Sequence, residues 1–275
     1  MVKVSVIGLG KVGSALAFCL ARDNFDLLLV SRNKEKALGI KMDLIGAFPN
    51  QGNKINAGSL EDVFDSDVVV FTAGEAAFPS GGLVEANERL VKETFAKLKL
   101  NKKSRLVVIT TPVDRMAELA WRISGLDASK VIGFGGQLDL NRLKYLICED
   151  LKDFSKEVNC AFVGEHGKNG IPVFRQVVSD RKKLSDSAKN FYSQFLAPFE
   201  APVFAVGKEL SDLVKALSVK KETVLTVSHF DEKTGLFLTW PCRLSEKGVL
   251  GTMRVEMNDE EKKDLASLVL KRKSS

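Results

Sequence analysis

Histidine is scarce in this sequence, and one of its two histidines stands where proton transfer is feasible. His166 lies between glycines in the segment VGEHGKNGIPVF, directly after a strand-like stretch. An imidazole in a tight turn with exposed backbone is suited to acid–base chemistry near neutral pH. His229 lies inside another strand-like stretch, and we expect it to be structural.

A carboxylate and a guanidinium stand upstream at helical spacing. Asp139 and Arg142 are three residues apart in LDLNR, which places both on one face of a helix. Asp139 could orient the imidazole of His166 and favour its protonated form, and Arg142 could form a forked contact with a substrate carboxylate. From spacing alone, an ordinary ion pair between two surface residues is the simpler interpretation.

The glycine pattern GLGKVG follows the first strand-like segment and opens a helix-like one. In that position, Gly8 allows a tight turn, Gly10 allows a pyrophosphate to approach the backbone, and Gly13 allows close packing of helix on strand. The helix N-terminus then faces the phosphates. The residues expected to bind a dinucleotide here are Gly8, Gly10, Lys11, Val12 and Gly13.

The end of the second strand indicates which dinucleotide is preferred. An NAD-binding chain usually carries an acidic residue there to accept hydrogen bonds from the ribose 2′-hydroxyl. This sequence has Ser31 followed by Arg32. A hydroxyl with a guanidinium would bind a 2′-phosphate that a carboxylate would repel. The sequence therefore favours NADP(H), with NAD(H) also possible.

The elements that must position these residues alternate between strand and helix in the first half of the chain. Solidly apolar strands separated by helices are typical of a parallel sheet covered on both faces. We predict an α/β fold with an N-terminal Rossmann domain, a doubly wound parallel sheet, over residues 1–135. Its expected strands are 2–8, 26–30, 67–74, 105–112 and 130–135, and its expected helices are 11–22, 83–100 and 113–125.

In the second half, the expected helices and strands no longer alternate regularly, which predicts an α+β substrate domain over residues 136–275. The sequence suggests an antiparallel meander over 223–256, and Asn258 followed by three acidic residues predicts the start of a last helix. The active site would lie between the two domains. The other expected elements are helices at 139–152, 184–197 and 208–218 and strands at 159–164 and 171–178.

The composition excludes several classes of protein. Over 275 residues, 45% are hydrophobic and 28% are charged, which is typical of a soluble globular chain. No apolar run is long enough to span a membrane, and four scattered cysteines favour reduced thiols in a cytoplasm over disulfides or a metal site. The net charge of +6 would attract anions, but the basic residues are dispersed, so we expect no nucleic-acid binding. A run of three basic residues, KRK, lies at 271–273.

Five segments in order resemble the L-lactate/malate dehydrogenase family: GLGKVG, TAG at 72–74, TPVD at 111–114, SGLDASKVIGFGGQLDLNR at 124–142 and GEHGKNGIPVF at 164–174. The resemblance implies a homodimeric or homotetrameric 2-hydroxy-acid dehydrogenase. It makes His166 the catalytic acid/base, Asp139 its partner and Arg142 the clamp for the substrate carboxylate. It also implies cofactor contacts at Thr72, Ala73, Gly74, Asn87 and Thr111.

The sequence departs from the family in the segments that recognise the substrate. The family's loop after TAG carries an arginine that closes over the substrate, whereas EAAFPSGGLVEAN contains neither arginine nor lysine. Thr111 replaces the usual asparagine, and the usual glycine-rich pocket segment is not recognisable at 196–210. We expect a small 2-oxo/2-hydroxy acid as substrate, with malate/oxaloacetate first and lactate/pyruvate close behind. The alternative is an NADP-binding protein with weak or no turnover, such as a sensor or an assembly subunit.

Overall fold

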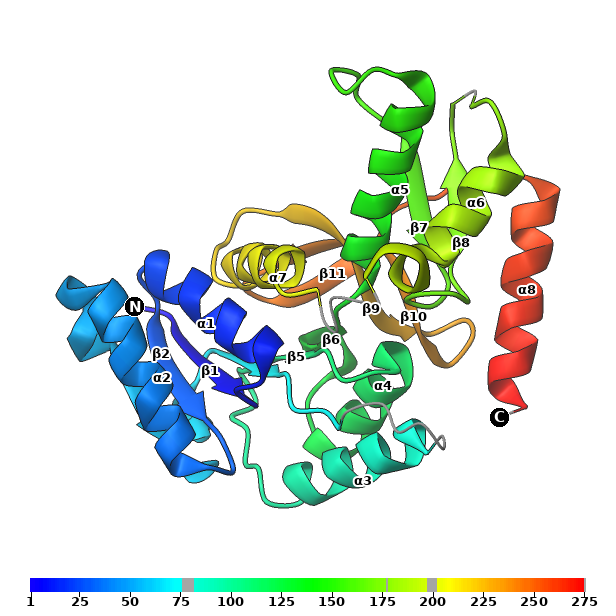
Figure 1. Ribbon diagram of the computed structural model, residues 1–275. Helices are drawn as coiled ribbons and strands as arrows, with labels where there is room; N and C mark the ends of the chain where they lie inside the picture. The colour runs from blue at the N-terminus through cyan, green and yellow to red at the C-terminus, as the bar shows by residue number, and fades with distance from the viewer. Residues whose placement is uncertain (76–81, 177, 197–201, 275) are drawn as a thin grey trace.

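A nine-stranded sheet forms the centre of the molecule (Figure 1), with strand order β11-β10-β9-β6-β5-β4-β1-β2-β3. The computed structural model describes residues 1–75, 82–176, 178–196 and 202–274. A separate hairpin pairs β7 with β8. The strands are β1 Lys3–Ile7, β2 Asp26–Val30, β3 Ile55–Gly58, β4 Val68–Phe71, β5 Arg105–Val108, β6 Val131–Gly133, β7 Cys160–Val163, β8 Ile171–Phe174, β9 Thr223–Asp231, β10 Leu236–Ser245 and β11 Gly248–Thr252.

The first six strands run parallel, as the apolar character of β1, β2, β4, β5 and β6 predicts. Strand β4 is buried along its whole length, because helices cover both faces of the sheet. The helices are α1 Lys11–Arg22, α2 Lys34–Ala47, α3 Leu83–Phe95, α4 Val113–Ser124, α5 Gly136–Leu151, α6 Arg181–Lys189, α7 Phe204–Ala216 and α8 Asp259–Lys273. This arrangement confirms the predicted doubly wound parallel sheet.

Two apolar clusters show which helices cover each face. Leu16 of α1, Leu210 of α7 and Leu138 of α5 belong to the cluster on one face. Val91 of α3 and Met116 of α4 belong to the cluster on the other face. In Figure 1, α3 and α4 accordingly lie on the opposite side of the sheet from α1 and α7.

Several predicted boundaries need correction. The helix expected over 83–100 ends at Phe95, and the strands expected over 67–74 and 105–112 each keep four residues. The helix expected over 184–197 is α6 followed by a π-helical turn at Tyr192–Leu196. Helix α2 and strand β3 were not predicted. Only Ala37 and Leu44 of α2 are buried, so its apolar pattern is weak.

The predicted antiparallel meander of the second half is confirmed as β9, β10 and β11, but its last strand is Gly248–Thr252 and ends before the expected boundary at 256. Strand β9 also pairs with β6 through Gly133 and Ser228. The meander therefore extends the first sheet, and this sheet crosses the proposed boundary between residues 135 and 136. That division into two domains stays a prediction. Short 3₁₀ turns complete the fold at Pro49–Lys54, Glu61–Asp65 and Ala128–Lys130.

The remaining layer holds the turn that contains His166. The β7–β8 hairpin joins the large sheet through an isolated bridge between Gly164 and Thr239 of β10. Helix α8 lies along this hairpin at the edge of the molecule, drawn in red in Figure 1. Among the described residues, no helix combines the length and apolarity that a bilayer span requires.

Candidate active site

The glycine loop between β1 and α1 has the geometry of a phosphate cradle. Gly8 has φ +99°, and a Cβ added there would lie 2.4 Å from the backbone nitrogen of Ala73. A Cβ on Gly13 would lie 2.0 Å from the carbonyl oxygen of Gly8. By contrast, the space around Gly10 is open, and α1 has no side-chain cap at its N-terminus. The loop, which includes Lys11 and Val12, therefore fits a dinucleotide pyrophosphate.

The segment after β4 borders this loop. The hydroxyl of Thr72 donates to the carbonyl of Gly8, and the backbone nitrogen of Ala73 donates to Ile7 at 3.1 Å. Gly74 follows, and a Cβ there would lie 3.8 Å from Oδ1 of Asn87. The fold thus brings 72–74 and the glycine loop together, as the resemblance implies for two parts of one cofactor site.

Asn87 and Thr111 are joined by a hydrogen bond. The buried side chain of Asn87 donates through Nδ2 to the carbonyl of Thr111 at 2.7 Å and accepts at Oδ1 from the backbone nitrogen of Glu75 at 2.8 Å. Thr111 precedes a cis proline, Pro112. Asn87 therefore holds the ends of two neighbouring strands in register at the carboxyl edge of the sheet.

Ser31 and Arg32 occupy the end of β2, where the 2′ position of the adenosine ribose would lie. The Ser31 hydroxyl accepts from the backbone nitrogen of Asn33 at 3.2 Å, and Asn33 caps α2. The Arg32 side chain is 84% exposed, with a guanidinium nitrogen 3.5 Å from the Glu75 carboxylate. The pair is too exposed to hold the guanidinium firmly.

His166 and Asp139 form the central contact of the site. The imidazole Nδ1 lies 2.6 Å from Oδ2 of Asp139, whose side chain is 2% exposed. The same oxygen accepts from the backbone nitrogen of Gly167 at 2.9 Å. A Cβ on Gly135 would lie 2.4 Å from Cγ of His166, so only glycine leaves room for the ring. The fold therefore brings together two of the predicted catalytic residues.

Arg142 completes the predicted trio. Its Nη1 donates to Oδ1 of Asp139 at 3.0 Å, and its guanidinium lies 5.6 Å from the ring centre of Phe191. The side chain of Arg142 is only 13% exposed. The simpler interpretation, an ion pair on the surface, is therefore wrong, because Asp139 is buried against the imidazole.

The electrostatic surroundings favour the protonated imidazole. Burial alone lowers the pKa of His166, but the charge and hydrogen bond of Asp139, followed by the charge of Asp114, raise it above its usual value despite the opposing charge of Arg142. A protonated imidazole beside a guanidinium can donate a proton to a carbonyl oxygen while the guanidinium binds a carboxylate.

Asp114 is a residue that the sequence reasoning did not single out. Its Oδ2 accepts from the backbone nitrogen of His166 at 2.9 Å, and its Oδ1 accepts from the Thr239 hydroxyl at 3.0 Å. Burial raises the pKa of this carboxyl. TPVD at 111–114 is one of the segments that carry the family resemblance, so the position of Asp114 in this segment could have identified it as a site residue.

Some predicted features fall outside the described residues. These are 76–81 in the loop that lacks a basic residue, Val177, and 197–201 in the unrecognised pocket segment. In the part of the chain that the structure describes, no group of three or more histidine, cysteine, aspartate or glutamate side chains is arranged to hold a metal.

The fold and the site together define a class: α/β proteins with a dinucleotide-binding loop and an Asp–His pair beside an arginine. Residues 2–133 match the family model described as lactate/malate dehydrogenase, NAD binding domain. An L-lactate dehydrogenase of Acetivibrio thermocellus is 30% identical over 290 residues, covering 94% of this chain and 91% of the relative. The chain belongs to the lactate/malate dehydrogenase family.

Solved structures agree with this assignment. The ligand-bound minor L-lactate dehydrogenase of Enterococcus mundtii has a TM-score of 0.85 and 26% identity, with coverage of 99% of this chain and 96% of that one. A lactate dehydrogenase from a Medee basin deep-sea metagenome library has a TM-score of 0.88 at 24% identity, covers 99% of this chain and 97% of that one, and supports the fold.

Proposed function

We propose that this protein is a 2-hydroxy-acid dehydrogenase that moves a hydride between a nicotinamide dinucleotide and carbon 2 of a small 2-oxo/2-hydroxy acid. The observation that carries the proposal is the 2.6 Å contact between His166 and the buried Asp139, with Arg142 bound to the same carboxylate. Relatives named L-lactate dehydrogenase support it.

Each residue of the trio has a role in this reaction. The bound nicotinamide would supply or accept the hydride. His166 donates a proton to the oxo group during reduction and accepts the hydroxyl proton during oxidation. Asp139 stabilises the imidazolium, and Arg142 binds the C1 carboxylate so that the reacting carbon is aligned.

The proposed substrate rests on the family resemblance, the names of the relatives and the composition of one loop. The family resemblance puts malate/oxaloacetate first, whereas the names of the relatives move lactate/pyruvate ahead. Residues 75–87 contain no arginine or lysine to bind a distal carboxylate. Because an unpaired carboxylate gains little from such a pocket, we propose weak discrimination between the two 2-oxo acids.

A panel of 2-oxo acids tests the function directly. Oxidation of NADH and NADPH is followed with pyruvate, oxaloacetate and longer 2-oxo acids, for the wild type and for His166→Asn. We expect kcat/KM values for pyruvate and oxaloacetate within about two decades, and a turnover about 10²–10⁴-fold lower in the variant with cofactor binding retained. Wild-type turnover in His166→Asn would exclude the mechanism.

We propose further that NADP(H) binds more tightly than NAD(H). The family model is an NAD-binding domain, and the glycine loop suits either cofactor. The strand end, however, carries Ser31 and Arg32 where a carboxylate would select NAD(H). A 2′-phosphate would compete with Glu75 for the exposed Arg32 guanidinium.

Calorimetric titration with NADPH and NADH tests this preference. Ser31→Asp places a carboxylate beside the 2′-phosphate and should weaken NADPH binding by about 1–3 kcal/mol while leaving NADH binding little changed. The matched control is Ser31→Asn, which is isosteric with aspartate and uncharged. Tighter binding of NADH by the wild type would contradict the preference.

The alternative function is an NADP-binding protein with weak or no turnover. Thr111 in place of an asparagine and the loop without a basic residue favour it. It predicts cofactor binding in the same titration with no 2-oxo acid reduced. We also propose a cytoplasmic location, where the four free cysteines would remain reduced, and a homo-oligomer.

A further inference from the structure

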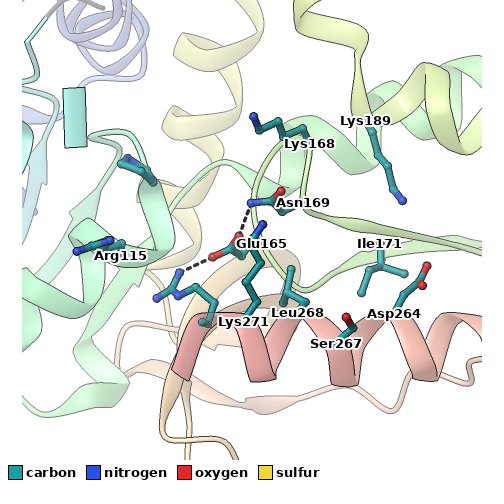
Figure 2. Close-up of a pocket in the computed structure, with 12 residues that line it drawn as sticks. Arg115, Glu165, Lys168, Asn169, Ile171, Lys189, Asp264, Ser267, Leu268 and Lys271 are labelled. Atoms are coloured by element: carbon teal, nitrogen blue, oxygen red, sulfur yellow. Dashed lines mark hydrogen bonds and ion pairs between the residues drawn. The ribbon is translucent and has the colours of Figure 1, made fainter. Parts of the chain in front are cut away.

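The C-terminal helix α8 lies against the turn that carries His166. A cavity of about 410 Å³ opens between them, and Figure 2 shows Glu165 at its centre and α8 along one side. The basic run at 271–273 ends this helix. The middle residue of this run, Arg272, is largely buried.

Arg272 forms a pair of contacts with two acidic side chains. Its Nη1 contacts Oε1 of Glu165, the residue directly before His166, and its Nη2 lies 3.3 Å from Oε2 of Glu118 on α4. The three side chains are 14%, 12% and 15% exposed for Arg272, Glu165 and Glu118. Asn169 donates to the other oxygen of Glu165 at 2.8 Å. Contacts of this kind are much stronger than exposed ion pairs.

Helix α8 is also fixed at its other end. Asn258 and Glu261 form a reciprocal capping box, with hydrogen bonds of 2.8 Å in each direction. Glu261 additionally accepts from the backbone nitrogen of Phe174 in β8 at 3.4 Å. These contacts fix the position of α8 relative to the β7–β8 hairpin, and therefore the position of Arg272 near the end of α8.

The turn that Arg272 reaches contains two glycines with positive φ. Gly164 and Gly167 flank Glu165 and His166 with φ of +95° and +87°, a backbone conformation that glycine adopts freely. Contacts from other elements hold this turn, among them the Gly164–Thr239 bridge and the Gly167–Asp139 hydrogen bond. Asp114 binds the backbone nitrogen of His166, and Arg272 binds the side chain of Glu165.

We propose that Arg272 is a positioning residue for the catalytic turn, holding Glu165 so that the imidazole of His166 faces Asp139. The effect on turnover rests on the proposed dehydrogenase function, but the effect on the imidazole does not. The charged groups that face the ring are Asp139 and Arg142 of α5 and Asp114 of α4. The Glu165–Arg272 pair contacts the turn at the residue before His166.

The test replaces both members of the pair, in Glu165→Gln/Arg272→Gln. One negative and one positive charge disappear together, so the net charge is unchanged. A shift in the pKa of the His166 imidazole then reports a change in the geometry of the turn. The matched control is Glu222→Gln/Arg243→Gln, which removes an exposed pair at 3.3 Å far from the site. Because the chain has two histidines, NMR titration of the ring protons resolves His166 once His229→Gln has assigned the other.

We expect the pKa of His166 to fall toward the unperturbed value of about 6.5 in the double variant, because the contact with Asp139 loosens. Turnover should fall on the order of tenfold or more with unchanged affinity for NADH and NADPH, and the control should match the wild type. Arg272→Lys keeps the charge without the fork, so it should give a smaller fall of the pKa.

An unchanged His166 pKa in a folded double variant would overturn the proposal, even with a lower melting temperature. Should the double variant fail to fold, a wild-type pKa in Arg272→Lys would overturn it equally. If the wild type reduces no 2-oxo acid, the proposed function fails, while the titration still decides the role of Arg272.

Discussion

Asp139 accepts at Oδ1 from Arg142, and its Oδ2 lies 2.6 Å from Nδ1 of His166. Replacing it by asparagine keeps the shape and removes the charge that raises the pKa of the imidazole. We therefore expect Asp139→Asn to lower this pKa, so that the rate of 2-oxo acid reduction declines at a lower pH than in the wild type. The pH profile of kcat, compared with NMR titration of His166, measures the shift, and identical profiles would contradict the assignment.

The same pair contributes to stability with a definite pH dependence. Because folding raises the pKa of His166, the contribution is fully present below the unfolded-state pKa of about 6.5 and is lost as the pH rises through the higher folded-state pKa. Asp139→Asn removes this pH dependence. Urea unfolding of the wild type and the variant on both sides of this window provides the check.

At the scale of elements, the start of α5 determines where Asp139 and Arg142, two of the proposed catalytic residues, lie. A Cβ on Gly136 would lie 2.2 Å from Cγ2 of Thr239 and 3.1 Å from Cγ2 of Thr226. Gly136→Ala should therefore destabilise the fold by about 1–3 kcal/mol. It should also lower turnover, because α5 carries Asp139 and Arg142.

Thermal unfolding and kcat measured on one preparation test this prediction. The control is Gly39→Ala in α2, where the space around the Cβ position is open. That change should raise stability by about 0.4–1 kcal/mol, because alanine restricts the unfolded chain. Equal stability of Gly136→Ala and the wild type would show that α5 shifts without cost.

At the scale of the whole molecule, the contacting helices α1 and α2 carry exposed apolar side chains. Phe18 of α1 and Leu38 and Met42 of α2 are 48%, 54% and 57% exposed, and Leu38 and Met42 lie one helical turn apart. Exposed apolar residues that lie together are typical of protein interfaces. We therefore expect this face to bury itself in a homo-oligomer, whose commonest form is a two-fold dimer.

Leu38→Glu/Met42→Glu should dissociate that assembly, because two carboxylates would be buried without partners. Sedimentation velocity of the wild type and the variant measures the change in mass. Phe64→Glu is the control, since Phe64 is comparably exposed at 46% on a different element. A wild type that sediments as a monomer would contradict the expectation, and so would a variant of unchanged mass.

The sequence alone determined the features that depend on neighbouring residues. Apolar runs predicted the parallel strands except β3, the glycine spacing predicted the loop at 8–13, and the spacing of Asp139 and Arg142 put both on one helix face. Tertiary packing decided that the same pair is buried against His166, since spacing cannot report burial. It also brought Asp114 to the backbone of His166, extended the first sheet with the meander, and buried Arg272 against Glu165 and Glu118. These contacts join segments 52 to 154 residues apart, and such pairings depend on how whole elements pack.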